Sequence, residues 1–260
     1  AALGITLRCP HLSFYTMAGE AKRDYPPSIH DQCPWWEKYH YVENYFSRLN
    51  VILSAGQPVC DLAVLHPQES LYLLHNSSWQ NNDQVKKMNT ACADITRWLI
   101  GAHLDFDFLD ETHLNDIPLE ISRDDQGAYL KLGQMKYRIL LVPPLLTIRS
   151  STLQWLKDFA AIDGQIIFTG LIAEHVDAQP SDQVKQLARD KQIDFSQDTI
   201  TQTLQETNRS ISIRDKQDQE ISDIIYQLRR LDNLWVVFLV NTNRETAYHN
   251  CRVQIKNPLP

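Results

Sequence analysis

Apolar and polar positions recur along the chain with two periods, one typical of helices and one of strands. The longest helical pattern covers 35–53, where apolar side chains return every three or four residues and form one wide stripe. Pro34 suits the first turn of this helix, and Gly56 favours its end. A short apolar run, 59–66, follows between two prolines and predicts a buried strand. The pattern therefore predicts a seam near residue 57, where one structural unit ends and another begins.

Beyond this seam, segments with strand character alternate with segments of helical period. Asp83 is a suitable N-cap for the first of these helices. The turn sequence 124–127 lies between two short apolar runs and predicts a small hairpin. The order of elements predicts the α/β class, with a flavodoxin-like parallel sheet flanked by helices. The predicted strands are 104–109, 119–121, 128–132, 137–142 and 165–170, and the predicted helices are 83–102, 151–162 and 181–191, with a short helix beginning at 110.

The two ends of the chain differ from this middle part. Residues 2–7 form an apolar run that predicts a buried strand, and a long polar loop, 16–33, follows it. The C-terminal part contains alternating runs and a hairpin signal at Asp232-Asn233, which together predict a β-rich tail that opens a β-sandwich. The alternating runs lie at 210–213, 224–231, 234–241 and 251–255.

Composition narrows the classes of protein. The chain has 260 residues, with 25 basic and 32 acidic side chains and a formal charge of −7. This balance disfavours nucleic acid and anionic membrane as main partners. No apolar stretch reaches the roughly 18 residues of a membrane span, and no signal peptide is visible, so cytoplasm and periplasm both stay open as locations. The cysteines number five and form no C-x-x-C pair, which predicts structural thiols.

Motifs for cofactor or nucleophilic chemistry are missing from the sequence. It contains no G-x-G-x-x-G after a strand and no G-x-x-x-x-G-K-[ST], so no cofactor is predicted. It also lacks a G-x-C-x-G or G-x-S-x-G elbow, which predicts that the flavodoxin-like domain is catalytically silent. The segment 103–113 holds four carboxylates and two histidines. Strand alternation and a helix start account for the carboxylates, so no metal site is predicted.

The seam also carries a resemblance to a known group of enzymes. The motifs are Pro34-Trp35-Trp36, Tyr41 with Tyr45-Phe46-Ser47-Arg48-Leu49, and Leu53-Ser54-x-Gly56-Gln57-Pro58-Val59-x-Asp61, extended upstream by 10–15 and 22–27 and more weakly downstream by 240–242. This pattern resembles a junction in large glycoside hydrolases of the α-L-rhamnosidase and β-galactosidase-like type. In those enzymes the last helix of a (β/α)8 barrel leads into a flavodoxin-like domain similar to a glutamine amidotransferase.

The resemblance implies a division of the chain and a set of binding residues. Residues 1–57 would end a (β/α)8 catalytic barrel with its last strand, loop and helix, 58–192 would form the amidotransferase-like domain, and 193–260 would begin a β-sandwich. Active sites of such barrels lie at the carboxyl ends of the strands. The residues that would then face or flank a sugar pocket are His11, Tyr15, Arg23, Asp24 and Tyr25. Alternatively, His11 and the pair Arg23-Asp24 only hold the loop against its own barrel.

Glycoside hydrolysis uses two carboxylates, about 5 Å apart in retaining and roughly 6.5–9.5 Å apart in inverting enzymes. In the resembled barrels these acids sit on earlier strands, and Asp24 alone has a plausible position here. We therefore predict the C-terminal part of a glycoside hydrolase that acts on plant- or microbe-derived polysaccharide or glycoside. This part would mainly support the fold or shape the substrate site, and it would lack the catalytic pair of carboxylates. Its partner would be carbohydrate, and the chain could also form a homo-oligomer. The alternatives are a standalone carbohydrate-binding or scaffold protein, and a small enzyme with a site in the crevice of the sheet.

Overall fold

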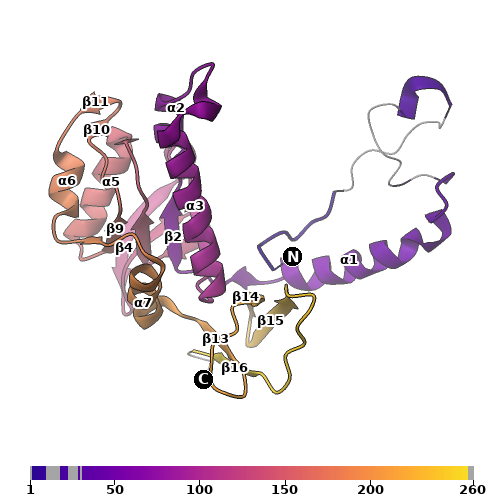
Figure 1. Cartoon of the computed structure of the whole chain (residues 1–260). Helices are drawn as coiled ribbons and strands as arrows, with labels where there is room; N and C mark the ends of the chain where they lie inside the picture. Colours follow the sequence, from indigo (N-terminus) through magenta and orange to yellow (C-terminus); the bar gives the residue numbers. More distant parts are fainter. Residues whose placement is uncertain (1, 10–17, 23–28, 30, 257–260) are drawn as a thin grey trace. The chain divides into compact units, whose positions relative to one another are not determined.

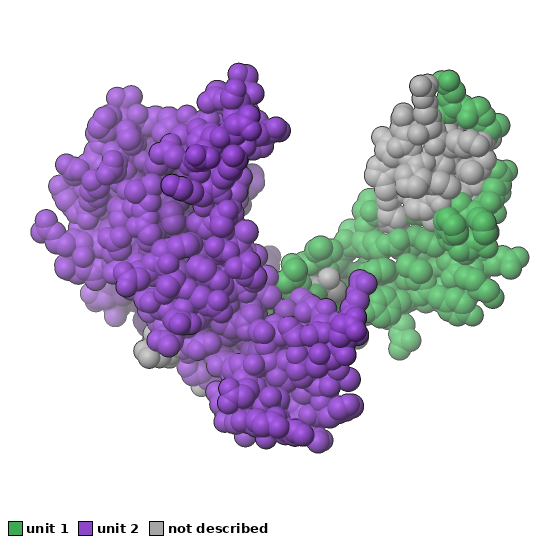
Figure 2. Space-filling model, in the orientation of Figure 1, with its two compact units in different colours: residues 1–58, 226–240, 259–260 green, residues 59–225, 241–258 purple. Residues whose placement is uncertain are grey.

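The computed structural model describes residues 2–9, 18–22, 29 and 31–256. The chain forms two compact units, which Figure 2 shows in different colours. Unit 1 consists of 1–58, 226–240 and 259–260, and unit 2 consists of 59–225 and 241–258. None of the helices described is long and apolar enough to cross a membrane. The domain boundaries that the sequence suggests at 57/58 and 192/193 remain predictions.

Unit 2 is built on a five-stranded parallel sheet. Its strands are β2 (Leu62–Leu65), β3 (Phe106–Leu109), β7 (Ile139–Val142), β9 (Gln165–Thr169) and β12 (Gln192–Ile193). They lie in the order β12-β9-β7-β2-β3, and every neighbouring pair is parallel. Numbered along the chain, this order is 2-1-3-4-5, which is the flavodoxin-like arrangement. The predicted fold class is confirmed.

Helices and a second small sheet cover the two faces of this parallel sheet (Figure 1). Two helices contribute to the core on one face: α3 (Asp83–Gly101) and α7 (Gln197–Asn208). The core on the other face is formed with α5 (Ser150–Ala161), α6 (Gln183–Ala188) and the antiparallel strands β4 (Leu119–Asp124), β5 (Gly127–Leu132) and β6 (Met135–Tyr137). Because both faces are covered, β2 and β7 consist entirely of buried residues.

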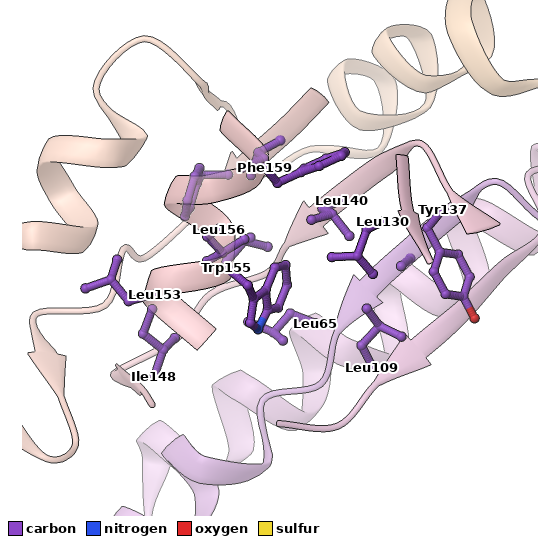
Figure 3. Close-up of a cluster of buried hydrophobic side chains, with 14 of the residues drawn as sticks. Leu65, Leu109, Leu130, Tyr137, Leu140, Ile148, Leu153, Trp155, Leu156 and Phe159 are labelled. Atoms are coloured by element: carbon purple, nitrogen blue, oxygen red, sulfur yellow. The ribbon is translucent and has the colours of Figure 1, made fainter. Parts of the chain in front are cut away.

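The core under α5 is packed by large side chains (Figure 3). Leu156 and Phe159 of α5 are fully buried and belong to one cluster with Leu140 of β7 and Leu130 of β5. Each such side chain contributes roughly 1.5–3 kcal/mol through burial. Gly164 is required beside this cluster, since a Cβ there would lie 2.4 Å from the Phe159 ring.

The connection from β3 to β7 contains the predicted hairpin. After the short helix α4 (His113–Asp116), β4 and β5 pair with Asp124 opposite Gly127, as predicted. The predicted strand 137–142 is instead divided at Arg138. Tyr137 ends β6, which pairs with β5, whereas the next residues form β7 in the parallel sheet. This one apolar run therefore contributes strands to two different sheets. The division lies at Arg138, whose backbone N–H donates to the carbonyl of Asp61.

A second group of short elements lies at the carboxyl edge of the parallel sheet. It comprises α2 (Gln68–Leu73), the 3-10 helix η3 (Trp79–Asn81), and a three-stranded sheet of β8 (Thr147–Ile148), β10 (His175–Val176) and β11 (Gln179–Pro180). Helix α2 follows β2, and β8 follows β7. These elements position the candidate site.

Two details of the helices differ from the sequence-based expectation. The N-cap of α3 is Asn82, whose side chain accepts a hydrogen bond from Gln84 N, and Asp83 is the first helical residue. Helix α7 was not predicted, although Ile200 and Leu204 are fully buried in the core that it shares with α3. The cap of α7 is Ser196, which accepts from Thr199 N.

The rest of unit 2 is a short antiparallel pair, β13 (Ile211–Arg214) with β16 (Arg252–Ile255). His103 joins this region to the end of α3, because its Nε2 lies 3.1 Å from the Ile221 carbonyl and 2.9 Å from that of Ile224. Its Nδ1 lies 3.1 Å from Glu220, which also pairs with Arg209. His103 is fully buried and therefore serves as a structural donor.

Unit 1 contains the long helix and an antiparallel sheet. Its elements are the 3-10 helices η1 (Gly19–Lys22) and η2 (Trp36–Lys38), helix α1 (Tyr39–Ser54), and the sheet β1 (Gln57–Pro58), β14 (Ile224–Leu231) and β15 (Leu234–Asn241), whose first and last residues extend into unit 2. Arg229 is buried and caps α1, donating to the carbonyls of Ala55 at 2.6 Å and Gly56 at 2.9 Å. Gly56 has a φ of +65°, so the predicted helix stop is confirmed.

The N-terminal segment corrects one expectation. Residues 2–9 form no strand, and Leu3, Ile5 and Leu7 are exposed rather than buried. A strand needs a hydrogen-bonded neighbour, and none of the described strands pairs with this segment. Arg8 instead holds it near α1 through Glu43 and the Tyr39 hydroxyl.

Candidate functional site

The parallel sheet has one position where ligands are expected. The connections from β2 and β7 leave toward opposite edges of the sheet, which makes the gap between these two neighbouring strands the topological switch point. In doubly wound folds, ligands bind outside the carboxyl ends of the strands at this point. The segments that follow β2 and β7 here are α2 and β8.

A hollow of about 390 Å³ lies between these segments. Its size falls in the range of small-molecule pockets, roughly 300–1,000 Å³. One wall is α2, the floor is β8 with Arg149, and the opposite wall is the turn between β10 and β11. The lining side chains are Glu69, Tyr72, Leu73, Thr147, Ile148, Arg149, Asp177 and Ala178.

Ser70 fixes the first wall to the floor. Its hydroxyl accepts from Leu146 N at 2.9 Å and Thr147 N at 3.2 Å, and it lies 3.2 Å from the Thr147 carbonyl as a donor. The side chain is fully buried. These three hydrogen bonds to one hydroxyl fix α2 against β8, so the wall and the floor of the hollow form a rigid corner.

The second wall is a tight turn with an uncommon backbone. Asp177 and Ala178 have φ values of 50° and 61°, the left-handed region that costs a non-glycine residue roughly 1–2 kcal/mol. Two contacts offset this cost. The Asp177 carboxylate accepts from Ser150 N at 2.9 Å and so caps α5, and Ala178 N donates to Thr147 Oγ1 at 3.2 Å. The hydrogen bonds from Ser150 lower the pKa of Asp177.

Arg149 is the central charge of the hollow. Its Nη2 lies 2.6 Å from Glu69 Oε1 and donates to Thr112 Oγ1 at 3.1 Å. Its backbone N–H donates to Glu111 Oε2 at 2.7 Å. Glu111 is buried, which raises the pKa of its carboxyl. Glu69 thus pairs with the guanidinium and Glu111 with the backbone N–H of Arg149, so the hollow presents both hydrogen-bond donors and acceptors while its cation is already paired.

The sequence pointed to other residues. His11, Tyr15, Arg23, Asp24 and Tyr25, the candidates for sugar binding, lie outside the described residues. The sequence predicted a crevice at the switch point of the sheet, but it did not predict which side chains line it. The reason is that Glu69, Tyr72 and Asp177 belong to no recognised motif. The only usable signal was the polar loop that follows the predicted strand 59–66.

The segment 103–113 is divided between opposite ends of the sheet. Asp105 precedes β3, whereas Glu111 follows it. Asp107 accepts from the Tyr137 hydroxyl at 2.9 Å, and Glu111 contacts Arg149. Within the described ranges, no group of three or more His, Cys, Asp or Glu residues could hold a metal ion.

Nucleophilic chemistry finds no support at the switch point. Thr169 ends β9 as a fully buried residue, and Gly170, with a φ of +68°, turns the chain away beside Pro144. Cys60 precedes β2 at the amino end of the sheet. Burial raises the pKa of its thiol well above the usual value, so Cys60 stays a neutral thiol.

Comparison with known proteins gives distant structural similarity. No protein-family model matches the chain, and no curated protein matches it either. An apo exo-carrageenase of the GH42 group from Bacteroides ovatus superposes with a TM-score of 0.44 and 14% identity over 78% of this chain. A catalytic mutant of a GH42 beta-galactosidase from G. stearothermophilus superposes with a TM-score of 0.39 and 11% identity over 81%. Both are glycoside hydrolases, and the matched part spans about a quarter of their length, 25% and 26%.

Proposed function

We propose that this chain is the C-terminal part of a glycoside hydrolase acting on plant- or microbe-derived polysaccharide or glycoside. In this proposal it shapes the substrate site and supports the fold, while the catalytic carboxylates belong to another part of the enzyme. The observation that carries the proposal is the exposed apolar surface of unit 1, which we expect to be buried against another part of the enzyme.

Helix α1 shows this most clearly. It has 16 residues, but Leu53 is the only buried one, while Tyr41, Tyr45, Val51 and Ile52 are half or more exposed. Helices of globular proteins gain most of their stability by burying an apolar face. An apolar surface of this kind marks an interaction site. The resemblance to the junction in large glycoside hydrolases implies what would cover this surface. In those enzymes the helix that corresponds to α1 is the last helix of a barrel, so the rest of the barrel would pack against it.

The N-terminal segment supports the same cover. Leu3, Ile5 and Leu7 alternate with other residues as in a strand, yet they lie exposed and unpaired with any described strand. A neighbouring barrel strand would supply both hydrogen bonds and packing for this segment. The proposal therefore keeps the division into 1–57, 58–192 and 193–260 as barrel end, amidotransferase-like domain and beginning of a sandwich.

The described part of unit 1 supplies no evident pair of catalytic carboxylates. Glu43 is paired with Arg8, and the hydrogen bonds from Arg8 lower the pKa of its carboxyl. A general acid needs the opposite shift. In the proposal, His11, Tyr15, Arg23, Asp24 and Tyr25 bind sugar hydroxyls and stack on pyranose rings, and they do not cleave the bond.

Two measurements test the proposed function. The first is the mass of the natural gene product in its source cells, by immunoblot against this chain. We expect a band well above 30.1 kDa, whereas a band at that mass would favour the standalone carbohydrate-binding alternative. The second is hydrolysis of a panel of aryl glycosides by the 260-residue chain. We expect no turnover, and hydrolysis that the substitution Asp24→Asn abolishes would refute the non-catalytic role.

A further inference from the structure

The switch-point hollow has a neighbour that shares one of its walls. A smaller hollow of about 140 Å³ lies along α2 and is lined by Tyr72, His75 and Trp79, among others. Tyr72 lines both hollows. Tyr72 is 62% exposed and Trp79 is 38% exposed. Two accessible aromatic rings therefore line these neighbouring hollows.

The charges of the larger hollow select against ionic ligands. Arg149 is already held by Glu69 and Thr112, and Asp177 adds a second carboxylate to the lining. An anion would approach these carboxylates without a free cation to receive it. The nearest helix, α2, has six residues, and the sequence contains no phosphate-binding loop. A metal cation finds no three-ligand group among the described side chains.

A neutral ligand with many hydroxyl groups fits the remaining chemistry. Carboxylate oxygens of Glu69 and Asp177 accept hydrogen bonds from hydroxyls, and the Arg149 guanidinium donates to them. The rings of Tyr72 and Trp79 offer flat faces of amphipathic character, onto which the C–H face of a sugar ring packs. Rigid walls reduce the entropic cost of binding, because the corner at Ser70 and the capped turn at Asp177 are already ordered.

We propose that the switch-point hollow of unit 2 is a non-catalytic binding site for a neutral oligosaccharide, which extends over Tyr72 toward Trp79. This site is formed by unit 2 alone, and its assignment does not rest on the proposed function. One sugar ring occupies the hollow between Glu69, Arg149 and Asp177. The next rings lie along α2 on the two aromatic side chains.

Calorimetric titration of the 260-residue chain tests this site without any assay of turnover. The probes are neutral tetrasaccharides of galactose, glucose, mannose and xylose, and one sulfated galactose tetrasaccharide. We expect at least one neutral probe to bind and the sulfated one to bind more weakly. If no neutral probe binds, or if the sulfated probe binds more tightly, the proposal is wrong.

Variants locate the bound sugar. We expect Tyr72→Ala to weaken binding by about tenfold or more, and Tyr72→Phe to retain it because the ring remains. Tyr41→Ala is the matched control, since Tyr41 is 63% exposed but lies in unit 1. Trp79→Ala should weaken the tetrasaccharide more than the corresponding disaccharide. Unchanged binding by the folded Tyr72→Ala variant would place the sugar elsewhere and overturn the assignment.

Discussion

We predict that Asp105 makes unit 2 less stable at high pH. It lies at the amino end of β3, partly buried and next to the carboxylate of Asp107. Burial, followed by the repulsion from Asp107, raises the pKa of Asp105 to about 7. The substitution Asp105→Asn removes the charge while keeping an oxygen that can accept the hydrogen bond from Phe106 N.

The size and sign of the effect follow from proton linkage. In the unfolded chain the pKa of the carboxyl is about 3.9, so the folded state holds the proton more tightly by about three pKa units. Stability is therefore fully present below about pH 4 and is lost as pH rises to about 7. Three units correspond to roughly 4 kcal/mol, and partial exposure of Asp105 to water reduces the expected loss to about 2 kcal/mol.

Urea unfolding at about pH 5 and about pH 8.5 measures this loss. We expect Asp105→Asn to be more stable than the natural chain at the higher pH, by about 2 kcal/mol, and the advantage to shrink by at least about 1 kcal/mol at the lower pH. Asp125→Asn, in the exposed turn between β4 and β5, serves as the control and should show no such pH dependence. An equal difference at both pH values would refute the reasoning, because it would not come from the proton.

Two further predictions concern stability. Replacing His103 by Leu leaves two buried carbonyls without their donor, so we expect the free energy of unfolding, measured in urea, to fall by roughly 2–4 kcal/mol. The exposed control His113→Leu should change it little. Similar losses for both variants would contradict the structural role of His103. Gly56→Ala would place a Cβ 2.2 Å from the Arg230 carbonyl oxygen, whereas Gly19→Ala has the same φ of +65° and open space. Both should lower the melting temperature through backbone strain, and Gly56→Ala should lower it clearly more, which equal shifts would disprove.

The elements that the sequence predicted well are those whose local pattern and tertiary role agree. Helix α3 has a long apolar period, and its predicted range, 83–102, nearly coincides with Asp83–Gly101. Helix α7 escaped prediction because its sequence is rich in threonine and glutamine and has only Ile200 and Leu204 as buried apolar residues. Threonine has weak helix propensity, so the helix depends on tertiary packing that a local pattern does not reveal.

The site shows the same division between topology and side chains. Alternation of strands and helices predicted the parallel sheet, and the sheet order then fixed where a crevice must form. The lining residues come from three segments that are far apart in sequence, so no short motif joins them. Glu111, after β3, and Arg149, after β8, illustrate this, since their contact spans 38 residues. Such pairs follow from the folded sheet and not from local spacing.

The two units present surfaces of different character, and our two proposals give them different partners. Unit 1 exposes large apolar side chains on α1, such as Tyr45 and Val51, and these gain stability only from a broad macromolecular cover. The switch-point hollow of unit 2 is small, charged and rigid, and it satisfies a ligand through individual hydrogen bonds and one or two stacked rings. In our two proposals, the first surface serves assembly of a larger enzyme, and the second serves recognition of sugar. Because their variants, Tyr41→Ala and Tyr72→Ala, affect separate surfaces, failure of one assignment leaves the other standing.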